Sequence, residues 1–100
     1  MQNWDEFEWD DANESHIAKH RVDRDEAEDA ATDPSAVVRR AGVDRYGNPR
    51  YTYIGKTEDS RILFMVVDRK RQRRFRIGSA RDAKFSEKRY YRRQSRGGNR

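Results

Sequence analysis

The sequence predicts a single small α+β domain, in which two N-terminal helices precede a four-stranded antiparallel meander and a C-terminal helix. Apolar residues recur at three- and four-residue spacing as far as Ala31, and from Val37 onward they alternate with polar ones. The later segments are joined by only a few residues, which favours antiparallel neighbours. We expect the domain to span residues 1–93 and residues 94–100 to form a basic, disordered tail.

Both N-terminal helices have recognisable ends. Asp10 is placed to cap the first helix. The face of this helix that we expect to be buried is a narrow stripe formed by Ala12, Asn13, His16, Ile17 and His20. Asp23 and Glu26 have the spacing of a capping box at the start of the second helix. This helix ends before Pro34, because the residue preceding a proline avoids helical backbone angles. Its small-residue face, formed by Ala27, Ala30 and Ala31, allows close contact with a partner chain, either a different protein or an identical copy.

The second half of the chain predicts strands at 37–38, 50–57, 61–68 and 73–80, and a last helix at about 82–94. The strand over 61–68 is apolar on both faces, which is typical of a central strand covered on each side. In the strand over 73–80, Arg74 and Arg76 share the face opposite Phe75 and Ile77.

The composition excludes several classes of protein. Of the 100 residues, 33% are hydrophobic and 41% are charged, and the longest apolar run is far too short to cross a bilayer. The absence of cysteine excludes a disulfide scaffold and a thiolate metal site. No secretory signal is visible after Met1, so we expect a soluble, cytoplasmic protein.

The charge is divided along the chain. Residues 1–35 contain 12 acidic and three basic residues, whereas the rest contains 20 basic and six acidic residues. A basic C-terminal part indicates an anionic partner, most plausibly nucleic acid. The acidic part either keeps the free protein soluble or occupies some of the basic surface within the same molecule.

The order of short motifs resembles one known family. The first half contributes Phe7-Glu-Trp-Asp10, Asn13, His16, Lys19-His20 and Asp33-Pro34. The second half contributes Arg50, Tyr53-Ile-Gly55, Arg61-Ile-Leu-Phe, Asp68-Arg69, Arg76-Ile77, Ser79-Ala-Arg81, Glu87 and Tyr91. Together these resemble BrnT-type toxins from about Phe7 to Arg93.

The resemblance implies a bacterial toxin of a type II toxin–antitoxin pair, with a fold similar to RelE ribonucleases. It also implies a BrnA-like antitoxin that carries a ribbon-helix-helix domain. Two positions depart from the family pattern. Asn48 stands where the family often has an acidic residue, and it cannot act as a general base. The turn Lys70-Arg71-Gln72 lacks the usual glycine.

RNA cleavage without a metal requires deprotonation of the 2′-hydroxyl, stabilisation of the phosphorane and protonation of the leaving 5′-oxygen. Arginine is a poor base because its pKa lies above ~12, but its guanidinium can clamp a phosphate through two parallel hydrogen bonds. We therefore expect electrostatic catalysis on a basic sheet face, with weak acid–base assistance. The candidate catalytic residues are Arg81, Arg69, Arg50, Glu87 and Tyr91.

Arg81 is the strongest candidate because it directly follows the last strand, although it can instead pair with Glu87 and anchor the last helix. The candidate RNA-binding residues are Arg61, Arg74, Arg76 and Lys56. Arg50 and Arg61 are equally consistent with ordinary charges at a strand edge. Tyrosines interleaved with these arginines suit base stacking or a half-buried sheet.

No metal or cofactor is expected. His16 and His20 have a spacing that can ligate zinc, but no third ligand is indicated. We interpret His20 as a structural histidine and Trp9 as part of the core beside the first helix.

The expected partners are an mRNA substrate, a ribbon-helix-helix antitoxin and, because the core is thin, a second copy of the chain; no membrane contact is expected. The alternative is a non-catalytic nucleic-acid-binding or regulatory protein on the same scaffold. Binding alone would depend steeply on salt, because each neutralised phosphate releases counterions. Catalysis would consume the substrate.

Overall fold

The elements follow the expected order, with one additional strand at the N-terminal end. The computed structural model describes residues 6–98. It contains β1 (Glu6–Phe7), α1 (Asp11–Ala18), α2 (Arg24–Ala31), β2 (Val37–Val43), β3 (Pro49–Lys56), β4 (Ile62–Lys70), a short 3-10 helix (Arg71–Arg73), β5 (Arg74–Asp82) and α3 (Phe85–Gly98). No helix in the described part of the chain is long and apolar enough to cross a membrane.

The sheet has five strands in the order β1-β5-β4-β3-β2, and it is mixed. Strands β2 to β5 form the predicted antiparallel meander, but β1 runs parallel to β5. The prediction of four antiparallel strands was therefore wrong in this detail. A two-residue strand shows no alternation in the sequence. It is held by tertiary contacts, namely the Phe7 and Phe75 rings at 5.9 Å and a 2.8 Å bond from Glu8 N–H to the Phe75 carbonyl.

Helices α1 and α2 begin as predicted, each with a reciprocal capping box. The Asp10 carboxylate accepts from Asn13 N–H and the Asn13 side chain accepts from Asp10 N–H, while Asp23 and Glu26 do the same in α2. The predicted stripe of α1 was too wide, because only Asn13 and Ile17 are buried. The interpretation of His20 as a structural histidine was wrong, since its side chain lies exposed in the turn after α1.

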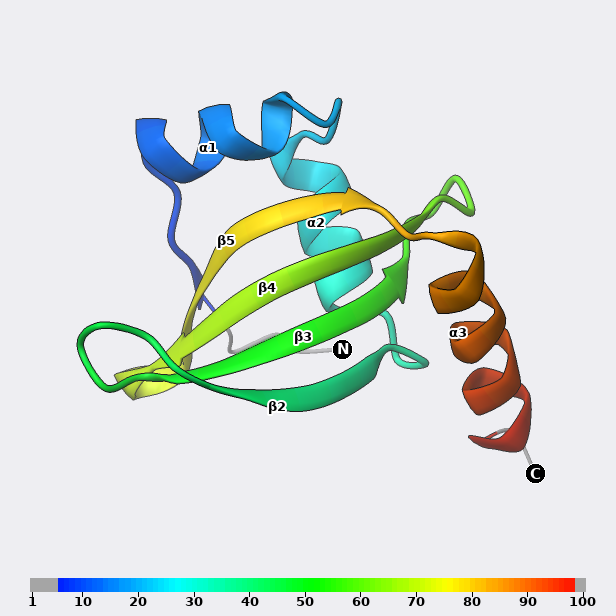
Figure 1. Ribbon diagram of the computed structural model, residues 1–100. Helices are drawn as coiled ribbons and strands as arrows, with labels where there is room; N and C mark the ends of the chain where they lie inside the picture. The colour runs from blue at the N-terminus through cyan, green and yellow to red at the C-terminus, as the bar shows by residue number, and fades with distance from the viewer. Residues whose placement is uncertain (1–5, 99–100) are drawn as a thin grey trace.

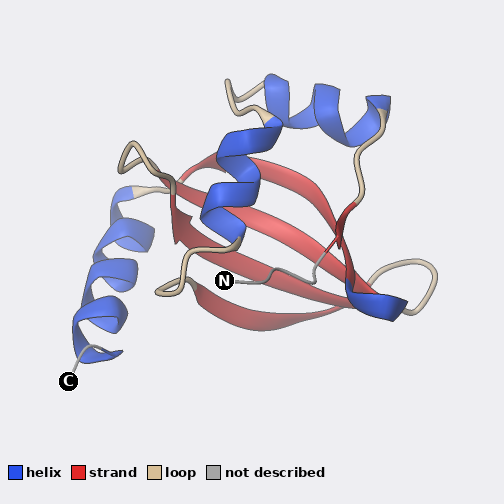
Figure 2. Ribbon diagram, turned by 180° about the vertical axis from the view of Figure 1, so that it is seen from behind, coloured by secondary structure: helices blue, strands red, loops and turns tan. Residues whose placement is uncertain are grey.

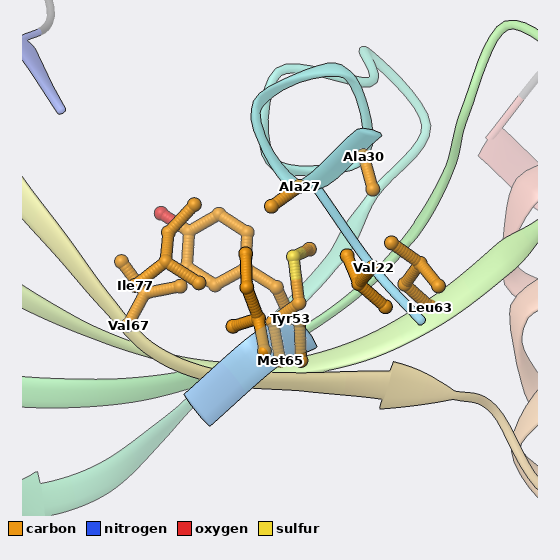
Figure 3. Close-up of a cluster of buried hydrophobic side chains, with 10 residues drawn as sticks. Val22, Ala27, Ala30, Tyr53, Leu63, Met65, Val67 and Ile77 are labelled. Atoms are coloured by element: carbon orange, nitrogen blue, oxygen red, sulfur yellow. The ribbon is translucent and has the colours of Figure 1, made fainter. Parts of the chain in front are cut away.

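The main core lies between α1, α2 and one face of the sheet (Figure 3). The small-residue face of α2 packs inside the domain, because Ala27 and Ala30 are fully buried. Gly55 of β3 makes this approach possible: a Cβ there would overlap the Ala30 carbonyl oxygen and lie 2.8 Å from its carbon. The face is therefore not available to a partner chain. Trp9 is half-buried beside this core and donates to Glu28 at 2.6 Å.

The two faces of the sheet have different surroundings. Helices α1 and α2 cross the face seen in Figure 2, whereas the opposite face is turned toward the viewer in Figure 1 and is flanked by α3 at one end. There Ile54, Ile62, Ala83 and Tyr91 form a second, smaller core cluster. Central strand β4 is therefore apolar on both faces, as predicted, but its outer face is covered only near α3.

The boundaries of three elements differ from the predicted ones. Strand β2 continues to Val43 through an irregularity at Gly42, which has a φ of +96°. The turn that lacks the family glycine places Gln72 and Arg73 in the left-handed region, at φ values of 61° and 58°. Helix α3 begins at Phe85 because Asp82 still pairs with Leu63 of β4. Its last turn extends into the expected tail, and residues 99–100 of that tail lie outside the described residues.

Candidate active site

The face of the sheet opposite α1 and α2, here called the open face, carries rows of aligned side chains from β2 to β5. Cross-strand register places Arg39, Thr52, Val66 and Ser79 in one row, and Val37, Ile54, Phe64 and Arg81 in the row nearer α3. Arg50, Asp68 and Arg76 form a third row at the far end. The predicted strand at 37–38 was too short to include Arg39. Because β2 continues to Val43, Arg39 lies within the strand and on this face.

A groove lies where α3 stands beside this face. The cavity has a volume of about 430 Å³ and is lined by Arg39, Thr52, Phe64, Ser86, Glu87 and Tyr90, among others. The Arg39 guanidinium lies 5.9 Å from the centre of the Tyr90 ring. The groove thus combines cationic, aromatic and hydroxyl groups, which are the groups that bind phosphates and bases of single-stranded RNA.

Arg81 is paired with Glu87, one of the residues that line this groove. The two guanidinium nitrogens donate to the two carboxylate oxygens at 2.9 and 3.0 Å, and the guanidinium lies 4.4 Å from the centre of the Phe64 ring. Glu87 also accepts from Lys84 N–H at 2.7 Å in the first turn of α3. Hydrogen bonding to Arg81 lowers the pKa of Glu87 and raises that of Arg81, so both groups are charged at neutral pH.

The far end of the open face contains further ion pairs. Arg50 donates to Asp68 at 2.7 and 3.2 Å, and Arg76 donates to Asp10 at 2.6 and 3.3 Å. Glu8 accepts from Lys70 and Arg74, at 2.7 and 3.0 Å. The acidic N-terminal part of the chain therefore neutralises some of the basic surface within the same molecule.

These ion pairs indicate that the stability of the fold decreases in acid. Hydrogen bonding to Arg76 lowers the pKa of Asp10 from 3.8 to about 2, and partners in the same way lower the pKa of Glu8, Asp82 and Glu87. A carboxylate whose pKa is lowered by folding stabilises the fold above its unfolded-state pKa, and this contribution is lost as the pH falls toward the folded-state value.

We expect the melting temperature to fall as the pH is lowered through the range from 3.8 to about 2 in which Asp10 titrates. Circular dichroism melts across this range would measure it. Asp10→Asn keeps the cap acceptor and should flatten the dependence. Asp59→Asn, in an exposed turn, should leave it unchanged. Equal slopes in the wild type and Asp10→Asn would contradict the assignment.

Of the nine residues proposed from the sequence, Arg81 and Glu87 lie at the groove. Arg50, Arg74 and Arg76 lie at the far end of the same face, and the other four lie elsewhere: Arg61, Arg69, Lys56 and Tyr91. Arg69 is on the helix-covered side, where its guanidinium lies 4.1 Å from the centre of the Tyr51 ring and donates to Tyr53 Oη at 2.8 Å. Arg69 and the groove therefore lie on opposite faces of the sheet, so they cannot contact the same phosphate.

Arg61, Tyr91 and Lys56 have structural surroundings. Arg61 donates to Asp82 and Glu26 and to the carbonyl oxygens of His20 and Arg21, and thereby fastens the end of α1 to β4. The Tyr91 hydroxyl donates to Asp33 at 2.6 Å, and burial, with this bond, raises the pKa of Tyr91 to about 12. Lys56 lies 5.9 Å from the Tyr91 ring centre.

Sequence reasoning missed Arg39 and Ser86 as groove residues. Tyr90, one of the tyrosines that the sequence suits to base stacking or to a half-buried position, lines the groove, whereas Tyr91 projects from a different side of the same helix and is buried. Within residues 6–98, no three His, Asp or Glu side chains are grouped as metal ligands. The exposed pair His16 and His20 has ring centres 6.3 Å apart.

Fold and site together define a small basic α+β domain with a groove beside its C-terminal helix that is lined by charged, aromatic and hydroxyl side chains. The family model described as "Ribonuclease toxin, BrnT, of type II toxin-antitoxin system" matches residues 9–87, and the chain belongs to this family. The resemblance seen in the sequence motifs is therefore confirmed. No curated protein matches the chain.

Proposed function

We propose that this toxin is a metal-independent endoribonuclease that cleaves mRNA in the bacterial cytoplasm and thereby arrests growth. The observation that carries the proposal is the paired Arg81 and Glu87 at the groove between the open sheet face and α3. An arginine beside a carboxylate supplies a phosphate clamp and a proton acceptor at one place. We further propose that its protein antitoxin carries a ribbon-helix-helix domain, as BrnA-like antitoxins do.

In the proposed reaction, Arg81 clamps the scissile phosphate and stabilises the charge that develops on the phosphorane. A phosphate that takes over the guanidinium weakens the ion pair, which moves the pKa of Glu87 back toward its ordinary value. Glu87 then accepts the proton of the 2′-hydroxyl, whose oxygen attacks phosphorus. The bond from phosphorus to the 5′-oxygen breaks, this oxygen takes a proton from a water molecule, and Glu87 returns its own proton to solvent. The new end is a 2′,3′-cyclic phosphate.

The rest of the open face supports binding in this proposal. Arg39 contributes a charge beside Tyr90 and Phe64, whose half-buried rings offer stacking surfaces for bases. Arg50 and Arg76 extend the charged face away from α3, where RNA phosphates would compete with Asp68 and Asp10 for the guanidinium groups.

The purified protein should cut a long unstructured mRNA in the presence of EDTA and leave 2′,3′-cyclic phosphate ends. Gel electrophoresis and end-group analysis would measure this. Cleavage that EDTA abolishes would contradict metal independence. Tight, steeply salt-dependent binding of uncut RNA would support the alternative, a nucleic-acid-binding protein on the same scaffold.

A further inference from the structure

Strand β2 lies at one edge of the sheet, and within residues 6–98 no other strand pairs with its outer side. After a half-buried Val37, every residue from Val38 to Val43 is exposed. Val38 and Val43 are 39% and 55% exposed, although both are apolar. A long exposed edge of this kind is a template on which another polypeptide strand can pair.

The register shows which backbone groups point outward. Hydrogen-bonded and non-hydrogen-bonded pairs alternate along an antiparallel ladder. Thr57 N–H donates to the Arg61 carbonyl at 2.8 Å, so Thr57 and Arg61 form a hydrogen-bonded pair from which the alternation can be counted. Counting back along β3, Gly55, Tyr53 and Tyr51 bond to β4, so Thr52 and Ile54 bond to β2. Their partners in β2 are Arg39 and Val37.

Val38 and Arg40 must therefore direct their N–H and C=O groups away from the sheet. A second contact agrees with this alternation. The backbone N–H of Lys56 also points toward the β2 side of β3, at a position that β2 does not reach. There it donates to the Asp33 carboxylate at 2.8 Å. At Val38 and Arg40 no described group takes this place.

The cations at this edge differ from those at the far end of the open face and beside α3, which are paired within the chain. Arg50, Arg61, Lys70, Arg74, Arg76 and Arg81 each have a carboxylate partner from the same chain. Within residues 6–98, Arg39 and Arg40 contact aromatic rings, and Arg40 also donates to the Gly42 carbonyl, but neither is paired with a carboxylate. They lie on opposite faces of β2, so an added strand would have a cation above and below it.

We propose that the outer edge of β2 binds an extended, acidic segment of the protein antitoxin, which adds a sixth strand to the sheet. The identification of this partner as the antitoxin rests on the proposed toxin function. Val38 and Arg40 supply the backbone pairing, while acidic side chains on both faces of the added strand meet Arg39 on one face and Arg40 on the other.

Two other occupants fit the edge less well. RNA has no alternating amide and carbonyl groups with which to continue a β-ladder. In a second copy of this chain, the antiparallel register that pairs Val38 with Arg40 sets Arg39 directly opposite its own copy, and like charges directly opposite are destabilising.

The probe for this site is a short synthetic peptide in which pairs of adjacent glutamates are separated by a valine-threonine pair, so that each face of the added strand carries glutamate. The matched control peptide has lysine in place of each glutamate. Titration of the peptide into the ¹⁵N-labelled full-length protein should shift the amide signals of residues 37–43 in a saturable manner. The lysine peptide should leave these signals in place.

Val38→Pro removes one outward N–H and leaves the bonds to β3 intact, so we expect peptide binding at least about tenfold weaker. Val38→Ala keeps the N–H and should bind the peptide like the wild type. Arg40→Glu should also weaken binding of the glutamate peptide. The dispersion of the amide spectrum reports whether each variant is folded, and Arg40→Glu keeps the test decisive if Val38→Pro does not fold.

Binding that persists in Val38→Pro, equal binding of the lysine peptide, or shifts confined to the groove beside α3 would each overturn the proposal. Self-association of the free protein that Val38→Pro abolishes would assign the edge to a second copy instead. Folded Val38→Pro should still cleave RNA, because Val38 lies on the helix-covered side. Peptide binding without any RNA cleavage would count against the proposed function and leave the edge site standing.

Discussion

Arg81→Ala is expected to reduce RNA cleavage by about a hundredfold to a thousandfold while the protein remains folded. This is the range found when a group that stabilises developing charge in a transition state is removed. Arg81 is the guanidinium that contacts both Glu87 and Phe64 at the groove. Single-turnover cleavage of a labelled RNA, followed well below the melting temperature, would measure the change.

Controls separate catalysis from anchoring of α3. Glu87→Gln keeps an acceptor for Lys84 N–H and should also lower the rate, because the amide cannot take the proton. Arg89→Ala removes an exposed cation from the same helix, 5.8 Å from the Phe85 ring centre, and should leave cleavage unchanged. Cleavage that falls only in step with the melting temperature, and returns on cooling, would show that Arg81 is purely structural.

Gly55→Ala should cause the largest loss of stability of any single methyl group added to the chain. The new Cβ would overlap the backbone carbonyl of Ala30, and a backbone atom cannot rotate away as a side chain does. Helix α2 would have to shift off β3, which we expect to lower the free energy of unfolding by about 3 kcal/mol. Urea denaturation would measure this loss.

Gly78→Ala is the matched control, because both glycines lie within strands. The nearest atom to a Cβ at Gly78 is the Val66 carbonyl oxygen at 3.9 Å, which is an ordinary contact. Its free energy of unfolding should stay within about 1 kcal/mol of the wild type. Equal losses in the two variants would indicate that strand glycines matter for a reason other than the packing of α2.

The sequence carried enough information for the element order, both capping boxes and the central strand, because these depend on local spacing. It did not predict β1, because the two residues of this strand are held in place by contacts with β5, which lies far along the chain. The extent of β2 was also hidden: Arg39-Arg40-Ala41-Gly42 shows no apolar alternation, since an edge strand that is exposed on both faces does not need one.

The candidate site was predictable only where its residues are close in sequence. Arg81 and Glu87 are separated by one strand end and one helical turn, so their meeting follows from local geometry. The dispersal of Arg69 and Tyr91 could not be foreseen, because strand parity and helix rotation decide which side of the sheet each residue faces. Nor does a sequence reveal which of its many arginines are already paired with its own carboxylates.

The pairing of Asp10 with Arg76 joins positions 66 residues apart and has a consequence for synthesis on the ribosome. The acidic N-terminal third emerges first, but the strand that holds it, β5, emerges almost last. Contacts of such sequence separation form slowly and only after the intervening chain is present. A nascent chain that stops before β5 lacks Arg81 and Glu87, together with Arg74, a partner of Glu8, and Arg76, the partner of Asp10. The groove beside α3 and the ion pairs that hold the N-terminal segment therefore form only after β5 and α3 have emerged, so the parts of the molecule that are made first and last become ordered together.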